Sequence, residues 1–562
     1  YIFFKALTLK QLALEIEALI HQPGKSNENG LDLSLQTLSH SYGNSGDKQI
    51  PLSYAQQRLW FLDQLEPGSS FYSIPAAWRL TGSLDIKALE KSLHHIIDRH
   101  ESLRTCFPES AGVVTQHVTK TGSIKLKQID LMQYSAATQK GSIRNLISED
   151  VEKSFELDKG PLFRCTLLQL NPLNHILILN MHHIISDGWS MGLLFKELTR
   201  CYNAYLKDDP PQLPQLSIQY KDFSIWQREY LQGDILDNQL SYWKKKLAGS
   251  PPVLELPIEN GRPVVQTYNG ATKSFRLSKE LSLGLRQLSR DRGVTLFMTL
   301  LATFKILLHR YTGQTDILVG TPIAGRRWEE IEGLIGFFVN TLVMRTDLSD
   351  NPDFMELLNR VKETSLEAYA HQDIPFEKLV EELHPERDLS HSPLIQVMFT
   401  FQNAPQNDLN FMNIKSEPIP LDQSTAKFDL SLAFTEKDQQ LYGTLNYNTD
   451  LFNSSTIKKM GGHFNTLIQE ILAKPDKPVA LIPLLTDAEY RKIVVEWNQS
   501  MVDYPIDKCV HHLIEEWAVK TPDSIAVVFE NEKLTYRELN ERSNQLAHHL
   551  ISLGAGPHTY VG

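Results

Sequence analysis

At 562 residues the chain is too long for one hydrophobic core, and its length predicts roughly two to four domains. Hydrophobic residues make up 41% of the sequence and charged residues 22%, a composition typical of ordinary globular proteins. The net charge of -11 is moderate, and the sequence contains no basic block that would follow a phosphate backbone, so a nucleic-acid partner is not expected.

The first predicted element is an amphipathic helix over residues 8–20, with leucine and isoleucine side chains on one face. Residues 22–47 are polar, contain glycine and serine and show no periodicity, so we expect a linker there. Because one short helix does not fold alone, the chain is expected to begin inside the end of another domain.

A long block of mixed strands and amphipathic helices follows, from residue 51 to about residue 474, and is expected to be one two-lobed α/β unit. A proline-containing break at residues 210–214 precedes the aromatic segment 220–226, where we place the boundary between the lobes. The longest apolar stretch, residues 294–308, is shorter than the roughly 20 residues that span a bilayer. It predicts a core helix capped by Thr295.

Residues 474–478 form a second predicted linker, and a third region starts near residue 485. Its strand over residues 525–529 and its helix over residues 536–550 make only the opening of an α/β domain. The four cysteines are scattered and form no CxxC pair, which favours a reducing cytoplasm over a disulfide or zinc framework. We expect no signal peptide and no membrane span.

Four pairs of adjacent histidines occur in the sequence, and only one of them lies at the end of a predicted strand. The run 173–181 is short and aliphatic and predicts a buried strand, which His182 and His183 follow directly. Gly188 permits a sharp turn, and Ser190 is placed to cap the helix that follows. The other three pairs lie in helical patterns, which favours a structural or exposed role for them.

Adjacent residues at a strand end point to opposite faces, so the two histidines are not expected to share one metal ion. This geometry favours one buried, structural histidine and one catalytic histidine. An imidazole with a pKa of about 6.5 can take a proton from an amine or hydroxyl that attacks a carbonyl, which indicates acyl transfer. Asp187 can accept the proton of that imidazole or pair with an arginine from elsewhere, and the spacing leaves both alternatives open.

Residues 182–188 (HHIISDG) resemble the HHxxxDG signature of the condensation domains of nonribosomal peptide synthetases. Six further segments resemble the other motifs of this family and follow in the family's order. They are 53–61 (SYAQQRLWF), 99–105 (RHESLRT), 220–226 (YKDFSIW), 335–345 (IGFFVNTLVMR), 371–376 (HQDIPF) and 387–394 (RDLSHSPL). Residues 1–20 resemble the last helix of a carrier protein, and residues 534–539 (LTYREL) resemble the first motif of an adenylation domain.

The resemblance implies an α/β fold of two chloramphenicol-acetyltransferase-like lobes, the fold of CoA-dependent acyltransferases, arranged as a V-shaped pseudodimer. It also implies how the chain divides. The expected parts are the C-terminal helix of a peptidyl carrier domain (1–22), a linker (23–49), the condensation-domain N-lobe (50–225) and C-lobe (226–474), and a linker with the N-terminal fragment of an adenylation domain (475–562).

The implied reaction joins two substrates that upstream and downstream peptidyl carrier domains deliver on phosphopantetheine arms. The acceptor amine attacks the donor peptidyl or acyl thioester and forms an amide without consuming ATP. Tethering raises the effective substrate concentration to roughly millimolar, so proximity carries much of the catalysis. The expected partners are these carriers and the adjoining adenylation domain, with no nucleic acid, no membrane, no metal and no permanently bound cofactor.

The resemblance implies roles for individual residues as well. His183 is the expected catalytic residue, which either removes the amine proton or orients the amine, and the Gly188 backbone N–H is expected to contact substrate. Asp187 is expected to pair with an arginine of the second lobe, for which Arg326 is the candidate. The remaining expectations are structural support from His182, Arg58 and Arg104 and tunnel lining by Asn340 and Ser392.

Relatives with other activities differ at recognisable positions. Heterocyclisation domains replace both histidines by aspartates, and plant-type acyltransferases need a DFGWG motif, which this sequence lacks. Epimerisation domains share HHxxxDG but normally precede another condensation domain, and non-catalytic docking modules usually lose one histidine. These two remain the alternatives. A carrier remnant directly upstream favours the type that joins an L-configured donor to an L-configured acceptor.

Overall fold

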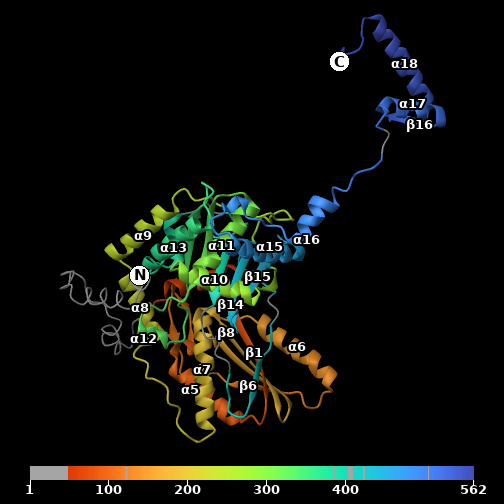
Figure 1. The fold of residues 1–562 in the computed structure, drawn as a ribbon. Helices are drawn as coiled ribbons and strands as arrows, with labels where there is room; N and C mark the ends of the chain where they lie inside the picture. The colour runs from red at the N-terminus through yellow and green to blue at the C-terminus, as the bar shows by residue number, and fades with distance from the viewer. Residues whose placement is uncertain (1–48, 121–123, 385–387, 403–408, 422–423, 504–505) are drawn as a thin grey trace. The chain divides into compact units, whose positions relative to one another are not determined.

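The computed structural model describes residues 49–120, 124–384, 388–402, 409–421, 424–503 and 506–562 of the chain (Figure 1). The predicted carrier helix at residues 8–20 and the linker at residues 22–47 lie outside the described residues. The chain divides into two compact units, of which the first ends at Thr486 and the second comprises Asp487–Gly562. Each unit is described by itself.

The first lobe of the first unit contains a five-stranded sheet in the order β13-β1-β8-β7-β6. Its strands are β1 (Ser73–Thr81), β6 (Leu126–Asp130), β7 (Phe163–Asn171), β8 (Asn174–His182) and β13 (Lys415–Pro418). The central strand β8 confirms the prediction of a buried strand over residues 173–181, since all of its residues after Asn174 are buried. A continuous aliphatic run suits this position because helices cover both faces of the sheet.

Alternate side chains of β8 enter two different cores, as the period of two in a strand requires. Leu177, Leu179 and Met181 pack in the core with α5 (Ile86–Arg99) and α7 (Gly188–Tyr205). On the other face, Ile176 and Ile178 pack in the core with α6 (Ala136–Glu152). Figure 1 shows α5 and α7 together and α6 apart from them. The end of β8 is therefore held from both sides.

The second lobe contains a six-stranded sheet in the order β11-β10-β12-β14-β15-β9, with helices packed against it. The strands are β9 (Gly270–Arg276), β10 (Asp316–Ile323), β11 (Asn340–Asp347), β12 (Val397–Gln402), β14 (Leu430–Lys437) and β15 (Gln440–Asn448). The helices are α10 (Lys279–Asp291), α11 (Leu296–Thr312), α13 (Phe354–Ala370) and α15 (Ser454–Ala473). Strand β12 pairs in parallel with β10 and β14, whereas the other pairs are antiparallel.

Helix α11 confirms the predicted core helix at the longest apolar stretch. Residues 298–308 are all buried, and the Thr295 side chain accepts a hydrogen bond from the Met298 N–H as the predicted N-cap. In the part of the chain that the structure describes, no single helix meets the length and hydropathy criteria for crossing a bilayer. The pair α10 and α11 meets them only jointly, and the two helices are bent by 109°.

Two elements do not respect the predicted boundary between the lobes at residue 225. Helix α8 (Tyr220–Tyr230) runs through that boundary without a break. Strand β13 belongs by sequence to the predicted C-lobe, but it pairs antiparallel with β1 of the first sheet, with Trp78 opposite Pro418. The edge of β1 would otherwise present unpaired backbone groups, and β13 satisfies them. A segment of the second half of the chain thus completes the first lobe.

Shorter elements connect these layers. The remaining helices of the first unit are α4 (Tyr54–Leu65), α9 (Gly233–Leu247), α12 (Glu329–Glu332) and α14 (Phe376–Leu383), with 3-10 turns at Glu101–Arg104, His183–Ile185 and Val479–Leu481. The remaining short strands are β2 (Thr105–Cys106), β3 (Glu109–Ser110), β4 (Val113–Val114) and β5 (His117–Val118). Ser53 starts α4 with a capping box that it shares with Gln56.

The second unit is a hairpin with helices. It contains α16 (Asp487–Tyr490), a π-helical turn (Arg491–Glu496), α17 (Val510–Lys520), β16 (Ile525–Phe529), β17 (Glu532–Thr535) and α18 (Tyr536–Ser552). Strand β16 confirms the predicted strand at residues 525–529, and α18 confirms the predicted helix at residues 536–550. Apolar side chains such as Phe529 remain exposed, because a two-stranded sheet cannot bury them.

Candidate active site

The pair His182 and His183 lies where β8 ends and a single 3-10 turn begins. His182 is buried, and its Nδ1 accepts a hydrogen bond of 3.1 Å from the Ile184 N–H. His183 is half-buried, and its backbone N–H donates a hydrogen bond of 2.7 Å to the Tyr72 carbonyl. The two rings diverge as the sequence predicted, and the His183 ring meets the Phe337 ring edge-on at 4.7 Å.

The environment keeps both imidazoles neutral. Burial, followed by the positive charge of Lys427, lowers the pKa of His183 to about 3, and the nearby carbonyls of His183 and Ser186 oppose this only partly. Burial also lowers the pKa of His182 to about 3, with smaller contributions from His183 and Lys427. Within the described residues the buried Nδ1 of His183 has no hydrogen-bond partner. The His183 ring is therefore uncharged at neutral pH and is not engaged by another side chain.

Asp187 is fully buried and ties the histidine turn to the second lobe. Its carboxylate lies 3.3 Å from Nη2 of Arg326, and it accepts a hydrogen bond of 3.0 Å from the Phe338 N–H. Arg326 also donates to the carbonyls of Ile331 (2.5 Å) and Leu334 (2.7 Å). The predicted contact between Asp187 and Arg326 is thus present. Of the two alternatives left open for Asp187, the structure shows the pair with an arginine.

Asp187 also caps α7, and here the prediction for Ser190 was wrong. The Asp187 side chain accepts the Ser190 N–H at 2.8 Å, so Asp187 is the N-cap and the helix starts at Gly188. The Ser190 hydroxyl instead accepts a hydrogen bond from Arg326 (2.8 Å) and donates one to the Gly336 carbonyl (2.9 Å). A serine three residues inside the cap is free to make this contact between the lobes.

Gly188 is not needed for a sharp turn, contrary to the prediction. Its φ lies outside the left-handed region that favours glycine. A Cβ atom added at Gly188 would meet no heavy atom within 4 Å. The residue is exposed at the N-terminus of α7, where backbone N–H groups lack intrahelical partners. The absence of a side chain leaves space in front of this helix end.

The two predicted supporting arginines bind other protein groups. Arg58 of α4 forms an ion pair of 2.9 Å with Glu377 of α14, and its guanidinium lies 5.6 Å from the Phe376 ring centroid. Arg104 donates to the Thr119 carbonyl at 2.8 Å within the first lobe. Arg58 therefore joins α4 to α14, whereas Arg104 supports only the first lobe.

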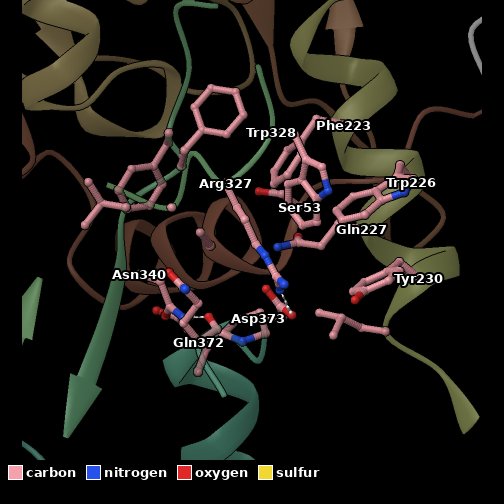
Figure 2. A pocket seen from close by; sticks show the side chains of 18 residues that line it. Ser53, Phe223, Trp226, Gln227, Tyr230, Arg327, Trp328, Asn340, Gln372 and Asp373 are labelled. Carbon is pink, nitrogen blue, oxygen red and sulfur yellow. Dashed lines mark hydrogen bonds and ion pairs between the residues drawn. The ribbon is translucent and has the colours of Figure 1, made fainter. Parts of the chain in front are cut away.

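A narrow pocket of about 50 Å³ lies next to the site, and Figure 2 shows its lining. Phe223, Trp226, Tyr230 and Trp328 form an aromatic side, while Asn340, Gln372 and Asp373 supply polar groups (Figure 2). Arg327 reaches between these groups to Asp373, with which it forms an ion pair of 2.9 Å. Phe337 lines this pocket and also contacts His183, so the pocket and the histidine share one wall.

The two predicted tunnel residues fall in different places. Asn340 lines the pocket, but its side chain donates to the carbonyls of Gln372 (3.0 Å) and Ile374 (2.8 Å) and accepts from the Phe376 N–H (2.9 Å). Its amide therefore holds the wall together. Ser392 does not line this pocket, and its hydroxyl donates to Gln266 at 3.3 Å.

Three further residues at the site were missed from sequence. The Tyr220 hydroxyl donates to the Phe337 carbonyl at 2.6 Å and so fixes the wall beside His183. Both residues lie inside recognised motifs, so the motifs contained a signal for them. Lys427, whose charge acts on both histidines, lies outside every motif and had no such signal.

Potential metal ligands gather elsewhere. Among the described residues, ligand atoms of Cys509, His511 and His512 lie within 4.8 Å of one another, and all three residues are exposed. They lie in the second unit at the start of α17, where the positive end of the helix dipole disfavours a cation.

Two lobes of sheet and helix, with a histidine turn at the end of a central strand, define an acyltransferase-like class of protein. The family model for the condensation domain matches residues 47–494, and the model for the AMP-binding enzyme matches residues 514–562. The chain belongs to the condensation-domain family of nonribosomal peptide synthetases and continues into the start of an adenylation domain.

Relatives and solved structures agree with this assignment. The chain is 49% identical over 520 residues to one of the linear gramicidin synthase proteins of Brevibacillus parabrevis, covering 92% of this chain and 10% of that protein. It is 40% identical to phosphinothricin tripeptide synthetase PhsC of Streptomyces viridochromogenes, covering 92% of this chain and 48% of that protein. The chain thus spans about half of PhsC and only about a tenth of the gramicidin synthase protein.

Among solved structures, the X-domain from teicoplanin biosynthesis is 28% identical with a TM-score of 0.71, covering 78% of this chain and 99% of that chain. A four-domain nonribosomal peptide synthetase is 23% identical with a TM-score of 0.77, covering 92% of this chain and 40% of that chain. The second likeness concerns the fold alone. Together they confirm the predicted α/β fold of CoA-dependent acyltransferase type.

Proposed function

We propose that the first unit joins two carrier-bound substrates through an amide bond. The observation that supports this most directly is the neutral, half-buried His183 at a turn that Asp187 and Arg326 hold in place. A neutral imidazole in a fixed position can accept a hydrogen bond from an attacking amine. The open space in front of Gly188, a few residues away, leaves room for the second reactant.

In this reaction the acceptor amine nitrogen attacks the thioester carbonyl carbon of the donor. His183 accepts a hydrogen bond from the amine and takes its proton as the carbon–nitrogen bond forms. The carbon–sulfur bond of the tetrahedral intermediate then breaks, the sulfur takes up a proton, and the donor phosphopantetheine arm leaves as a thiol. The backbone N–H groups at the start of α7, including that of Gly188, face the negative charge that develops on the carbonyl oxygen.

Asp187 acts in this mechanism as a positioning residue. Its carboxylate binds Arg326, the Ser190 N–H and the Phe338 N–H, so it holds α7 and the second lobe together beside His183. His182 holds the turn through Ile184, and Arg58 and Arg104 hold neighbouring elements in the same way. Asn340 keeps the pocket wall in place on the side of α14.

The partners in the proposal are an upstream and a downstream peptidyl carrier domain and the adjoining adenylation domain, as in the synthetases that this chain resembles. The donor and the acceptor are both L-configured, and no cofactor stays bound between turnovers. Three of the four cysteines are buried as free thiols, which supports the cytoplasm as the compartment.

The test mixes the complete 562-residue chain with one carrier loaded with a donor aminoacyl thioester and one loaded with an acceptor. Mass spectrometry of the acceptor carrier detects the dipeptidyl thioester. His183→Ala is expected to slow its formation by roughly 10²–10⁴-fold. The matched control is His94→Ala, which removes an exposed histidine of another adjacent pair on α5. Condensation by His183→Ala at the wild-type rate contradicts the proposal.

The same experiment separates the two alternative functions. An epimerisation domain inverts the Cα atom of the donor without forming a new amide, which chiral analysis of the released amino acid detects. A docking module binds both carriers and leaves their thioesters unchanged. Either result contradicts condensation.

A further inference from the structure

Lys427 brings a positive charge to the histidine turn from the second lobe. It precedes β14, and its Nζ lies 4.9 Å from the Tyr72 ring centroid and 5.3 Å from the Phe71 ring centroid. The Tyr72 carbonyl accepts the backbone N–H of His183 at 2.7 Å. The two aromatic rings that hold the Lys427 ammonium thus belong to the segment to which the histidine turn is bonded.

The Lys427 charge is not neutralised by the protein. In the described part of the chain no carboxylate forms an ion pair with Lys427, although part of its side chain stays accessible to solvent. The other cation that acts on it, Arg58, is paired with Glu377 at 2.9 Å. An unpaired ammonium beside a desolvated imidazole disfavours a second positive charge on that imidazole.

The other groups around the turn contribute little net charge. They are His182 of β8, which is neutral, Asp187 paired with Arg326, Tyr72 before β1, Tyr220 of α8, Arg58 paired with Glu377, and Arg164 of β7 beside Asp150. Burial raises the pKa of Tyr72 to about 12 and also raises that of Tyr220, so both phenols stay protonated at neutral pH. Lys427 is the unpaired charge among these described groups.

We propose that Lys427 is a positioning residue for the reaction, whose ammonium holds His183 in its neutral form so that the imidazole stays available to the attacking amine. This inference rests on the proposed function of His183. It agrees with the pKa of His183, for which Lys427 is the largest cause of lowering after burial. Burial and Arg58 lower the pKa of Lys427 itself to about 8, so Lys427 is charged throughout the acid range in which His183 would protonate.

The sign of the effect follows from this arrangement. A positive charge near His183 lowers the pKa of the imidazole, so removing that charge raises it. Replacing Lys427 with a neutral residue is therefore expected to move the acid limb of the pH–rate profile upward by about one pH unit. Activity of the variant near pH 7 and above stays close to that of the wild type, because His183 is neutral there in both proteins.

The experiment compares wild-type chain, Lys427→Met and Lys427→Arg. Lys427→Met keeps an unbranched side chain of similar length without the charge, and Lys427→Arg keeps the charge. Condensation rates are measured between pH 4 and pH 8, and the His183 ring is titrated by NMR in the complete chain with ¹³C-labelled histidine. The ring signal is assigned by its loss in His183→Gln. Lys415→Met removes an exposed lysine of β13 as the matched control.

We expect Lys427→Met to shift both the acid limb and the onset of the His183 titration upward, Lys427→Arg to restore both, and Lys415→Met to change neither. Equal behaviour of Lys427→Met and wild type in the titration overturns the inference, as does an equal shift in Lys427→Met and Lys427→Arg. If His183→Ala condenses normally, the proposed function fails, but the NMR titration still reports whether Lys427 acts on His183. The two failures are therefore distinguishable.

Discussion

Two pairs of adjacent histidines on the first lobe, His94–His95 on α5 and His182–His183 after β8, show how position decides what the same residues can do (Figure 1). Both pairs are followed by two isoleucines and, soon after, an aspartate. On α5 the isoleucines face the core and the histidines face outward, with His94 exposed. After β8 one histidine is buried and the other lies beside contacts from the second lobe.

The difference teaches that a helix surface and a strand end expose a histidine pair differently. Neighbouring helix residues are about 100° apart, so both members of a pair can share the outer face. Neighbouring strand residues point to opposite faces. At the end of β8 this separates His182, which binds the Ile184 N–H, from His183, which has no side-chain hydrogen bond among the described residues.

The largest effect is expected from breaking the anchor of the second pair. Asp187→Ala leaves the buried Arg326 guanidinium without its carboxylate and is expected to lower the free energy of unfolding of the first unit by about 3–5 kcal/mol. The control is Asp98→Ala, which removes the exposed aspartate that follows the first pair on α5 and is expected to cost under about 0.5 kcal/mol. Urea titration measures both variants, and equal losses would show that the two pairs are anchored alike.

A smaller loss is expected from the structural histidine. His182→Ala leaves the Ile184 N–H without an acceptor in a buried turn and opens a cavity beside Phe155, at a cost of about 2–3 kcal/mol. His95→Ala loses a part-buried hydrogen bond of 3.2 Å to Tyr205 and is expected to cost about 1 kcal/mol. Thermal unfolding at pH 7 compares the two. A larger loss for His95→Ala would reverse the comparison.

The pH dependence of stability sharpens the comparison further. The pKa values of His182 and His183 are lowered to about 3 in the folded protein, whereas unfolding returns them to about 6.5. The unfolded chain then binds more protons, so the stabilisation is complete above about pH 6.5 and is lost as the pH falls through the range down to 3. Between pH 7.5 and pH 5.5 we expect each histidine to remove about 1 kcal/mol from the free energy of unfolding.

The variant His182→Gln,His183→Gln tests this assignment. It is expected to lose most of that slope, measured by urea titration at several pH values. A slope unchanged from the wild type would place the titrating groups elsewhere.

The smallest effect on stability is expected at Gly188. An alanine there meets no heavy atom within 4 Å and suits a helix better than glycine, so Gly188→Ala is expected to change the free energy of unfolding by less than about 0.5 kcal/mol. The added methyl group enters the space that we assign to substrate, so condensation is expected to slow by about tenfold. The matched control is Gly141→Ala on α6, which also has open space around it. Unchanged turnover in Gly188→Ala would contradict the assignment of that space.

The sequence by itself determined the local elements at the site. The aliphatic run before His182 predicted strand β8, and Thr295 before an apolar stretch predicted the start of α11. The motif order predicted the family and the acyltransferase-like fold. These predictions succeed because strand periodicity, helix capping and the resemblance of short motifs depend on residues that are close together in the chain.

Only the tertiary structure decided which distant segments meet. The sequence proposed Arg326 as the partner of Asp187 but left a second alternative open, and it assigned Ser190 to a cap that Asp187 occupies. It placed β13 in the wrong lobe, and it contained no sign of Lys427 beside His183. Such contacts join residues more than 100 positions apart, and their formation depends on how the two lobes pack, which no local pattern specifies.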